Sequence, residues 1–169
     1  CKKGKTRVQL FGSGSILREA IAAADLLSAD FKVEADIWSC TSFNQLKRDG
    51  DDVSRWNMLH PDKKPKMSHV EKCLLDTDGP VVAATDYVKL FADQIRAYVP
   101  RSYSVLGTDG FGRSDTRQAL RKHFEVDRYY IAVAALNALM EDGSVSVKTV
   151  NAAIKKYGID PNKNNPLMS

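Results

Sequence analysis

The sequence has 169 residues, of which 43% are hydrophobic and 27% charged. This size and composition are typical of one soluble globular domain with a full core, so we expect residues 1–169 to form a single domain. The net charge of +4 comes from basic residues interleaved with acidic ones, a pattern that disfavours a nucleic-acid partner. No stretch approaches the roughly 20 apolar residues that span a membrane.

The chain begins with CKKGKTRVQL, which has neither an initiator methionine nor the apolar centre of a signal peptide. We therefore expect it to belong to a longer protein. Its three cysteines, Cys1, Cys40 and Cys73, are odd in number and widely spaced. This spacing disfavours a disulfide framework and favours a reducing cytoplasm, with Cys40 and Cys73 buried as small hydrophobic side chains.

In the first half, a predicted strand over 7–11 is followed by the turn GSGS and a helix over 16–30, for which Ser15 is the expected N-cap. A second strand is predicted over 34–40. The long polar connection over 41–76 is expected to hold one or two short helices and a surface loop.

In the second half, a strand over 80–85 leads into a predicted helix over 85–99, which Pro100 ends. A fourth strand is predicted over 103–107. Three further helices and a polar surface tail follow, over 115–124, 127–141, 146–157 and 159–169. The alternation of strand and helix predicts an α/β fold with a parallel sheet and helices on both faces.

Two glycine loops invite a cofactor interpretation. In the first, Gly12 and Gly14 would need a third glycine where Leu17 stands, and an acidic residue at the end of the second strand, where Ser39 and Cys40 stand. We therefore interpret GSGS as a tight turn between strand and helix.

The second loop, GTDGFGRSD over 107–115, lacks both the lysine of a P-loop and the flanking glycines of a nucleophile elbow. Its glycines permit positive φ angles, and Ser114 or Asp115 is expected to cap the next helix. Arg113 favours a bound anion, whereas Asp109 and Asp115 oppose it. A loop shaped for contact and a phosphate site both remain open.

The other polar residues form no complete reactive set. Arg113, Arg117 and Arg121 share a helical spacing, which predicts either a solvated basic face or contact with an acidic neighbour. The histidines His60, His69 and His123 lack metal-ligand spacing. We therefore expect no catalytic, cofactor-binding or metal-binding residue in this chain.

Several stretches taken together resemble the C-terminal domain of the bacterial homodimeric pyruvate dehydrogenase E1 component. They occur in the same order, from Val8 to the tail, as VQLFGSGSILREA, DIWSCTSFNQLKRDG, RWNMLHP, VVAATDYVKLFADQIRAYVP, YSVLGTDGFGRSDTR and HFEVDRYYIAVAAL. The pair LGTDGFGRSD and HFEVD is the most specific part of this resemblance.

The resemblance implies the three-layer α/β/α sandwich of the transketolase C-terminal domain. That fold has a mixed five-stranded sheet whose antiparallel edge strand enters first. This strand would lie upstream of Cys1, so four parallel strands in the order 2-1-3-4 are expected here. ADIWS would then form an unpaired edge, which invites association between sheets.

The resemblance also implies a function for the whole enzyme, which would use thiamine diphosphate and Mg²⁺ to decarboxylate pyruvate and to acetylate the lipoyl groups of E2. The cofactor and metal would be bound by other domains, and none is expected in this chain. The implied partners are the N-terminal and middle domains of the same chain, a second E1 subunit and the E2 acetyltransferase, in the bacterial cytoplasm. The alternative is a stand-alone flavodoxin-like module that binds an anion or nucleotide.

The carboxyl ends of parallel strands form the functional edge of such sheets. We therefore expect four loops, over 12–15, 40–43, 85–87 and 107–115, to share one rim. Phe111 is predicted to be exposed in this chain as an anchor for an adjoining domain. The candidate contact residues are Gly107, Asp109, Gly110, Phe111, Gly112, Arg113, Ser114 and Asp115, with Gly12, Ser13, Gly14, Ser15, Thr85 and Asp86 on the same rim.

Overall fold

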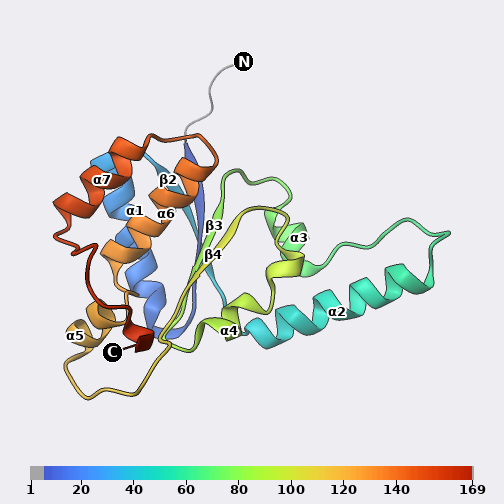
Figure 1. Ribbon diagram of the computed structural model, residues 1–169. Coiled ribbons are helices and arrows are strands. Elements are labelled where there is room, and N and C mark those ends of the chain that lie inside the picture. Colours follow the sequence, from blue (N-terminus) through green and yellow to red (C-terminus); the bar gives the residue numbers. More distant parts are fainter. Residues whose placement is uncertain (1–5, 169) are drawn as a thin grey trace.

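A computed structural model describes residues 6–168 and shows three layers, with a central sheet between two groups of helices (Figure 1). Cys1 and the basic stretch that follows it lie outside the described residues. No helix in the described part of the chain is long and apolar enough to cross a membrane.

The sheet has four parallel strands, in the order β2-β1-β3-β4. Their bounds are Arg7–Gly12 for β1, Glu34–Ser39 for β2, Val81–Ala84 for β3 and Tyr103–Leu106 for β4. All four residues of β3 are buried, as expected for a strand covered on both faces. The predicted order 2-1-3-4 is confirmed, and among the described residues β2 and β4 each pair on one side only.

One face of the sheet is covered by α1 (Leu17–Phe31), α6 (Arg128–Glu141) and α7 (Val147–Lys156) (Figure 1). Alternate residues of β1 point to this side, where Val8 and Leu10 are fully buried. Small residues such as Ala132 and Ala135 let α6 lie close to the sheet and to α1. The predicted helices over 16–30, 127–141 and 146–157 thus correspond to real elements, with no end shifted by more than one residue.

The other face is covered by α2 (Phe43–Leu59), α3 (His69–Leu74) and α4 (Lys89–Asp93). The single helix predicted over 85–99 is wrong, because α4 has one turn and a 3-10 turn follows it over Arg96–Tyr98. Tertiary hydrogen bonds compete with the helix here. The Tyr103 hydroxyl donates to the Ala92 carbonyl (2.7 Å), and Arg96 donates to the Tyr103 carbonyl (2.6 Å).

The connection between β2 and β3 also differs from the expected short helices. α2 has 17 residues, and Figure 1 shows it extending away from the sheet. Its far end is held by the returning loop, because the Lys66 ammonium lies 3.9 Å from the centre of the Trp56 ring and that ring stacks on His60. Asn57 exchanges two hydrogen bonds with the backbone of Lys66. Side-chain closure at the tip therefore supports a helix much longer than predicted.

The remaining elements lie beside the carboxyl edge of the sheet. α5 (Arg117–His123) is shorter than the predicted helix over 115–124. The tail ends in a 3-10 turn over Pro166–Met168, in which Pro166 is buried while Met168 is exposed. The Lys163 ammonium donates to the carbonyl of His123 (2.6 Å) and pairs with Glu125 (3.2 Å), so that the tail is attached to the end of α5.

Gly79, before β3, provides a test of this packing. Its φ is +84°, and a Cβ there would lie 1.8 Å from the carbonyl oxygen of Arg7 in β1. We expect Gly79→Ala to destabilise the fold by more than about 3 kcal/mol, because steric overlap adds to the cost of a positive φ. Gly143→Ala is the matched control, since Gly143 also has a positive φ (+75°) but open space around it. Urea unfolding of both variants measures the difference, and equal losses would contradict this packing.

Candidate functional site: the carboxyl rim and its ion cluster

The four predicted loops do meet at the carboxyl edge of the sheet. Their backbones are joined in strand order. The Cys40 amide donates to the Gly12 carbonyl (2.9 Å), the Ser13 amide to the Ala84 carbonyl (3.1 Å) and the Thr85 amide to the Leu106 carbonyl (3.1 Å). The rim is therefore continuous, since each loop is connected to a neighbour by the last hydrogen bonds of the sheet.

GSGS is a turn between strand and helix, as interpreted from the sequence. Gly14 has a φ of +56° and begins the 3-10 turn η1 (Gly14–Ile16), which leads into α1. Ser15 does not cap α1, which corrects the expectation, because its hydroxyl instead donates to Asp86 Oδ2 (2.9 Å). The loops after β1 and β3 are thereby cross-linked.

The first half of the 107–115 loop packs against the loop after β3. A Cβ at Gly107 would lie 2.7 Å from the Tyr87 carbonyl oxygen, so glycine allows the two backbones to approach. The Asp109 carboxylate accepts the backbone N–H of Lys89 (2.8 Å), and Thr108 donates to the Tyr87 carbonyl (2.9 Å). Asp109 is thus committed to holding the rim together.

The second half of this loop projects outward. Residues 110–115 are all exposed, and Arg113 and Ser114 form no hydrogen bond within residues 6–168. The predicted cap is wrong, because the Thr116 hydroxyl accepts the backbone N–H of Ala119 (3.3 Å) and caps α5. Asp115 accepts the Thr116 backbone N–H instead (2.6 Å). The short α5 begins two residues later than expected for this reason.

Exposed apolar side chains stand on three segments of the rim, and the 107–115 loop contacts the other two. Phe111 is 79% exposed, as predicted, and Leu90 and Met168 are 73% and 82% exposed. The 107–115 loop contacts the tail, since a Cβ at Gly110 would lie 2.7 Å from the carbonyl oxygen of Pro166. We refer to Tyr87, Leu90, Phe111, Leu167 and Met168 as the rim patch.

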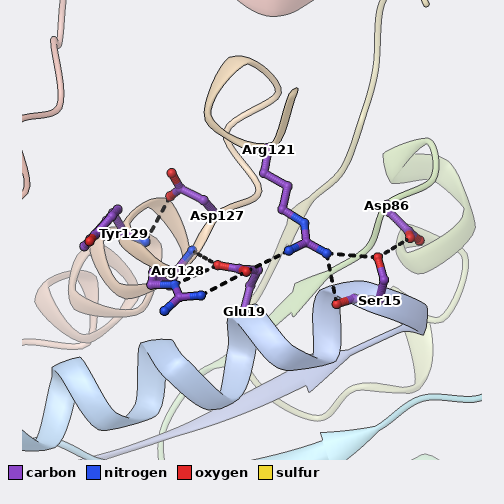
Figure 2. Close-up of polar contacts among 7 residues, drawn as sticks. All are labelled: Ser15, Glu19, Asp86, Arg121, Asp127, Arg128 and Tyr129. Atoms are coloured by element: carbon purple, nitrogen blue, oxygen red, sulfur yellow. Dashed lines mark hydrogen bonds and ion pairs between the residues drawn. The ribbon is translucent and has the colours of Figure 1, made fainter. Parts of the chain in front are cut away.

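An ion cluster around a buried carboxylate lies beside the rim and was not predicted from the sequence (Figure 2). Glu19, on α1, is only 5% exposed, and its carboxylate receives two guanidinium groups. Arg121 of α5 donates to Oε1 (2.8 Å), and Arg128 of α6 donates to Oε2 through both Nε (2.9 Å) and its backbone N–H (3.0 Å). Arg121 also donates to the Ser15 hydroxyl (3.1 Å), which connects the cluster to Asp86.

The signal for this cluster was present in the sequence. Glu19 follows Ile16 by three residues and precedes Ala23 by four, which places it on the buried face of its helix. A carboxylate on such a face requires a partner. The arginine spacing predicted either a solvated basic face or contact with an acidic neighbour. For Arg121 the second interpretation holds, and the acidic neighbour is Glu19 of the same chain. Arg117 remains exposed, and Arg113 precedes the helix.

The cluster keeps Glu19 ionised. Burial by itself would raise the pKa of Glu19, but the hydrogen bonds from Arg128 and the charges of Arg128 and Arg121 outweigh it and hold the pKa below its ordinary value. The pKa of Asp127 is instead raised above its ordinary value. Burial raises this pKa more than the backbone hydrogen bonds from Tyr130 and Tyr129 lower it.

The other candidate groups are dispersed. Among residues 6–168 there is no group of three or more histidine, cysteine, aspartate or glutamate side chains that could hold a metal ion. Cys40 is buried as expected, and burial raises the pKa of its thiol to about 12. Cys73 is only half-buried, which corrects the expectation. Its sulfur lies 3.4 Å from His69 Nε2. A recess of about 790 Å³ lined by Arg7, Asp36 and Asp78 lies along β2, away from the rim.

Removal of the central carboxylate tests the cluster. We expect Glu19→Gln to destabilise the chain by about 3 kcal/mol at pH 7, because the buried carboxylate loses its ion pairs while Arg121 and Arg128 lose their shared counter-charge. Asp62→Asn is the control, since Asp62 pairs with Lys63 on the exposed loop (3.0 Å), where an ion pair contributes at most about 1 kcal/mol. Chemical denaturation measures both, and a loss as small as that of the control would contradict the cluster's role.

The lowered pKa of Glu19 also predicts a pH dependence. Because the folded state binds this proton less tightly than the unfolded state, the contribution is complete above the ordinary carboxyl pKa of about 4.3 and is lost as the pH falls through the folded pKa. The difference in unfolding free energy between the parent chain and Glu19→Gln should therefore be constant from pH 7 to about pH 5 and shrink below it. A difference independent of pH down to pH 2 would refute this assignment.

Comparison with known proteins agrees with this geometry. The family described as the transketolase-like TK C-terminal domain matches residues 1–127. The pyruvate dehydrogenase E1 component of Cupriavidus necator is 60% identical over 161 residues, and that of Escherichia coli K12 is 52% identical over 166. These matches cover 95% and 98% of this chain, but the chain spans only 18% of each relative's length. They do not support the alternative of a stand-alone flavodoxin-like module.

Solved transketolases share the fold at low sequence identity. A split-gene transketolase, described as an inactive β4 tetramer, has a TM-score of 0.54 at 19% identity, covering 82% of this chain and 41% of that one. The transketolase from Leishmania mexicana has a TM-score of 0.51 at 20% identity, covering 85% of this chain and 18% of that one. With its four-stranded parallel sheet, its connected rim and the match over residues 1–127, the chain belongs to the transketolase-like C-terminal domain family.

Proposed function

We propose that this chain is the C-terminal domain of a pyruvate dehydrogenase E1 enzyme and that it serves contact rather than catalysis. The whole enzyme decarboxylates pyruvate with thiamine diphosphate and reductively acetylates the lipoyl groups of E2. High identity to E1 components over nearly the whole chain supports the enzyme assignment. The observation that carries the contact role is the exposed rim patch.

Apolar side chains of this size are costly to leave in water. Burial of one Phe or Leu side chain contributes about 1.5–3 kcal/mol, and several such side chains gathered on contacting segments indicate a protein interface. Phe111 stands on a loop whose base is fixed by Asp109 and Gly107, so that its position is prepared before any partner arrives. We infer that the rim patch is covered by the N-terminal and middle domains of the same chain or by a second E1 subunit.

The rim residues do not fit the cofactor of the whole enzyme. Mg²⁺ is held by several oxygen ligands, usually carboxylates together with substrate phosphates. Asp86 accepts the Ser15 hydroxyl and Asp109 accepts the Lys89 backbone N–H, and neither belongs to a group of three or more possible metal ligands within residues 6–168. We therefore assign thiamine diphosphate and Mg²⁺ to the other domains, together with the groups that act on pyruvate. The bacterial relatives and the free thiols of Cys40 and Cys73 support a cytoplasmic location.

Phe111→Asp in a full-length E1 that contains this domain tests the contact role. Placing a charge in a buried apolar interface should lower the melting temperature of the whole enzyme or weaken its subunit association, whereas the variant 169-residue chain should melt like its parent. The measurements are calorimetry and sedimentation on both forms, with pyruvate decarboxylation as the activity assay. The chain alone should show no decarboxylation.

Val147→Asp provides the matched control. Val147 is also an exposed apolar residue, but it begins α7, which packs on the helical layer away from the rim patch. We expect no change in the full-length enzyme, because a carboxylate is well tolerated in the first turn of a helix. If Phe111→Asp leaves the full-length enzyme as stable and as well assembled as this control, the contact role of the rim patch is wrong.

A further inference from the structure

The ion cluster has more positive charge than its structural task requires. Glu19 provides one carboxylate, and both of its oxygens are used by Arg121 and Arg128. One guanidinium would be enough to neutralise it. The second is a further positive charge beside a cavity whose lining also includes Arg117 and Asp127.

A cavity of about 410 Å³ opens beside this cluster. Its lining includes Arg117, Gln118 and Tyr129 in addition to the members of the cluster. The side chain of Arg117 forms no hydrogen bond or ion pair within the described range 6–168. The volume falls within the range of small-ligand sites, and the walls present donors from two helices, α5 and α6.

The guanidinium groups are positioned before any ligand binds. Arg128 is held by Nε and Nη2 on Glu19, and Arg121 by Nη1 on Glu19 and Nη2 on Ser15 (Figure 2). Within the described residues, no hydrogen bond uses Arg128 Nη1 or Arg121 Nε, so each side chain keeps a donor for another acceptor. Arginines fixed in this way lose little entropy on binding and suit the paired oxygens of an oxyanion.

Asp127 is the lining group that opposes an anion. Its Oδ1 accepts the backbone N–H groups of Tyr129 (2.9 Å) and Tyr130 (3.0 Å) and so caps α6. No ion pair joins Asp127 to an arginine among residues 6–168. The lining contains three guanidinium groups and the two carboxylates of Glu19 and Asp127. Its net charge is therefore +1.

We propose that the cavity between α5 and α6, lined by Arg117, Arg121 and Arg128, is a binding site for a small phosphate-bearing anion. A phosphate group supplies several negative oxygens at the spacing of guanidinium donors, and the remaining volume accommodates a small organic portion. This site is separate from the rim patch and does not rest on the contact role proposed above. Ligand occupancy would join α5 to the start of α6 and thereby brace the cluster behind the rim.

The test is an NMR titration of the 169-residue chain with inorganic phosphate at constant ionic strength, with acetate in a parallel series. The backbone amide signals of Arg117, Arg128 and Tyr129 should shift saturably with phosphate and not with acetate. Arg117→Gln should weaken the phosphate Kd by about tenfold, since one charge-assisted contact is removed. Because Arg117 is exposed and unpaired, this variant is expected to fold normally.

Arg55→Gln is the matched control, since Arg55 is an exposed arginine on α2 whose side chain forms no hydrogen bond or ion pair in the described chain. Its phosphate Kd should equal that of the parent. Shifts that rise linearly without saturation, equal shifts with acetate, or the same Kd in Arg117→Gln and Arg55→Gln would each overturn the proposed site. None of these outcomes bears on the full-length Phe111 experiment, so the two proposals fail separately.

Discussion

The ion pairs of the buried Glu19 carboxylate with Arg121 and Arg128 are the interactions on which the second half of the rim depends. Glu19 belongs to α1, which follows β1 in the chain. Its partners Arg121 and Arg128 belong to α5 and α6 and lie more than one hundred residues away in sequence. α5 has only seven residues and none of them is buried, so packing alone holds it weakly. The ion cluster therefore attaches α5, and with it the exposed 110–115 loop, to the helical layer, together with the contacts of Lys163 and Phe124 at the end of α5.

This arrangement separates two properties within one domain. The sheet and its two apolar cores provide rigidity through side chains that are fully buried, such as Leu10, Ile95 and Leu136. The rim has residues held by hydrogen bonds at the base of its loops and, in the 107–115 loop, residues left exposed at the tip. The proposed contact role assigns these exposed residues to an interface with other parts of a longer protein, and the chain spans less than a fifth of the E1 components it resembles.

Helix lengths show where sequence interpretation failed. The apolar pattern over 85–99 has helical period, but Tyr103 and Arg96 make hydrogen bonds with neighbouring backbone carbonyls and break the helix into two short turns. For the connection that contains α2 the sequence predicted one or two short helices, yet contacts of the Trp56 ring with His60 and Lys66 close the far end of a longer one. Both helix lengths depend on contacts of particular side chains with groups outside the apolar pattern. The period of that pattern does not reveal such contacts.

The sequence by itself determined the class of fold, the strand order through its resemblance, and the meeting of the glycine loops at one edge. These features follow from local apolar runs and from the geometry of parallel strands. Only the tertiary structure decided which side chains act together there. Glu19 was visible as a charge on a buried face, but its partners were set by how α5 and α6 pack against α1. The exposure of Phe111 was foreseen, whereas its grouping with Leu90 and Met168 required the fold, because those segments are brought together only by long-range contacts.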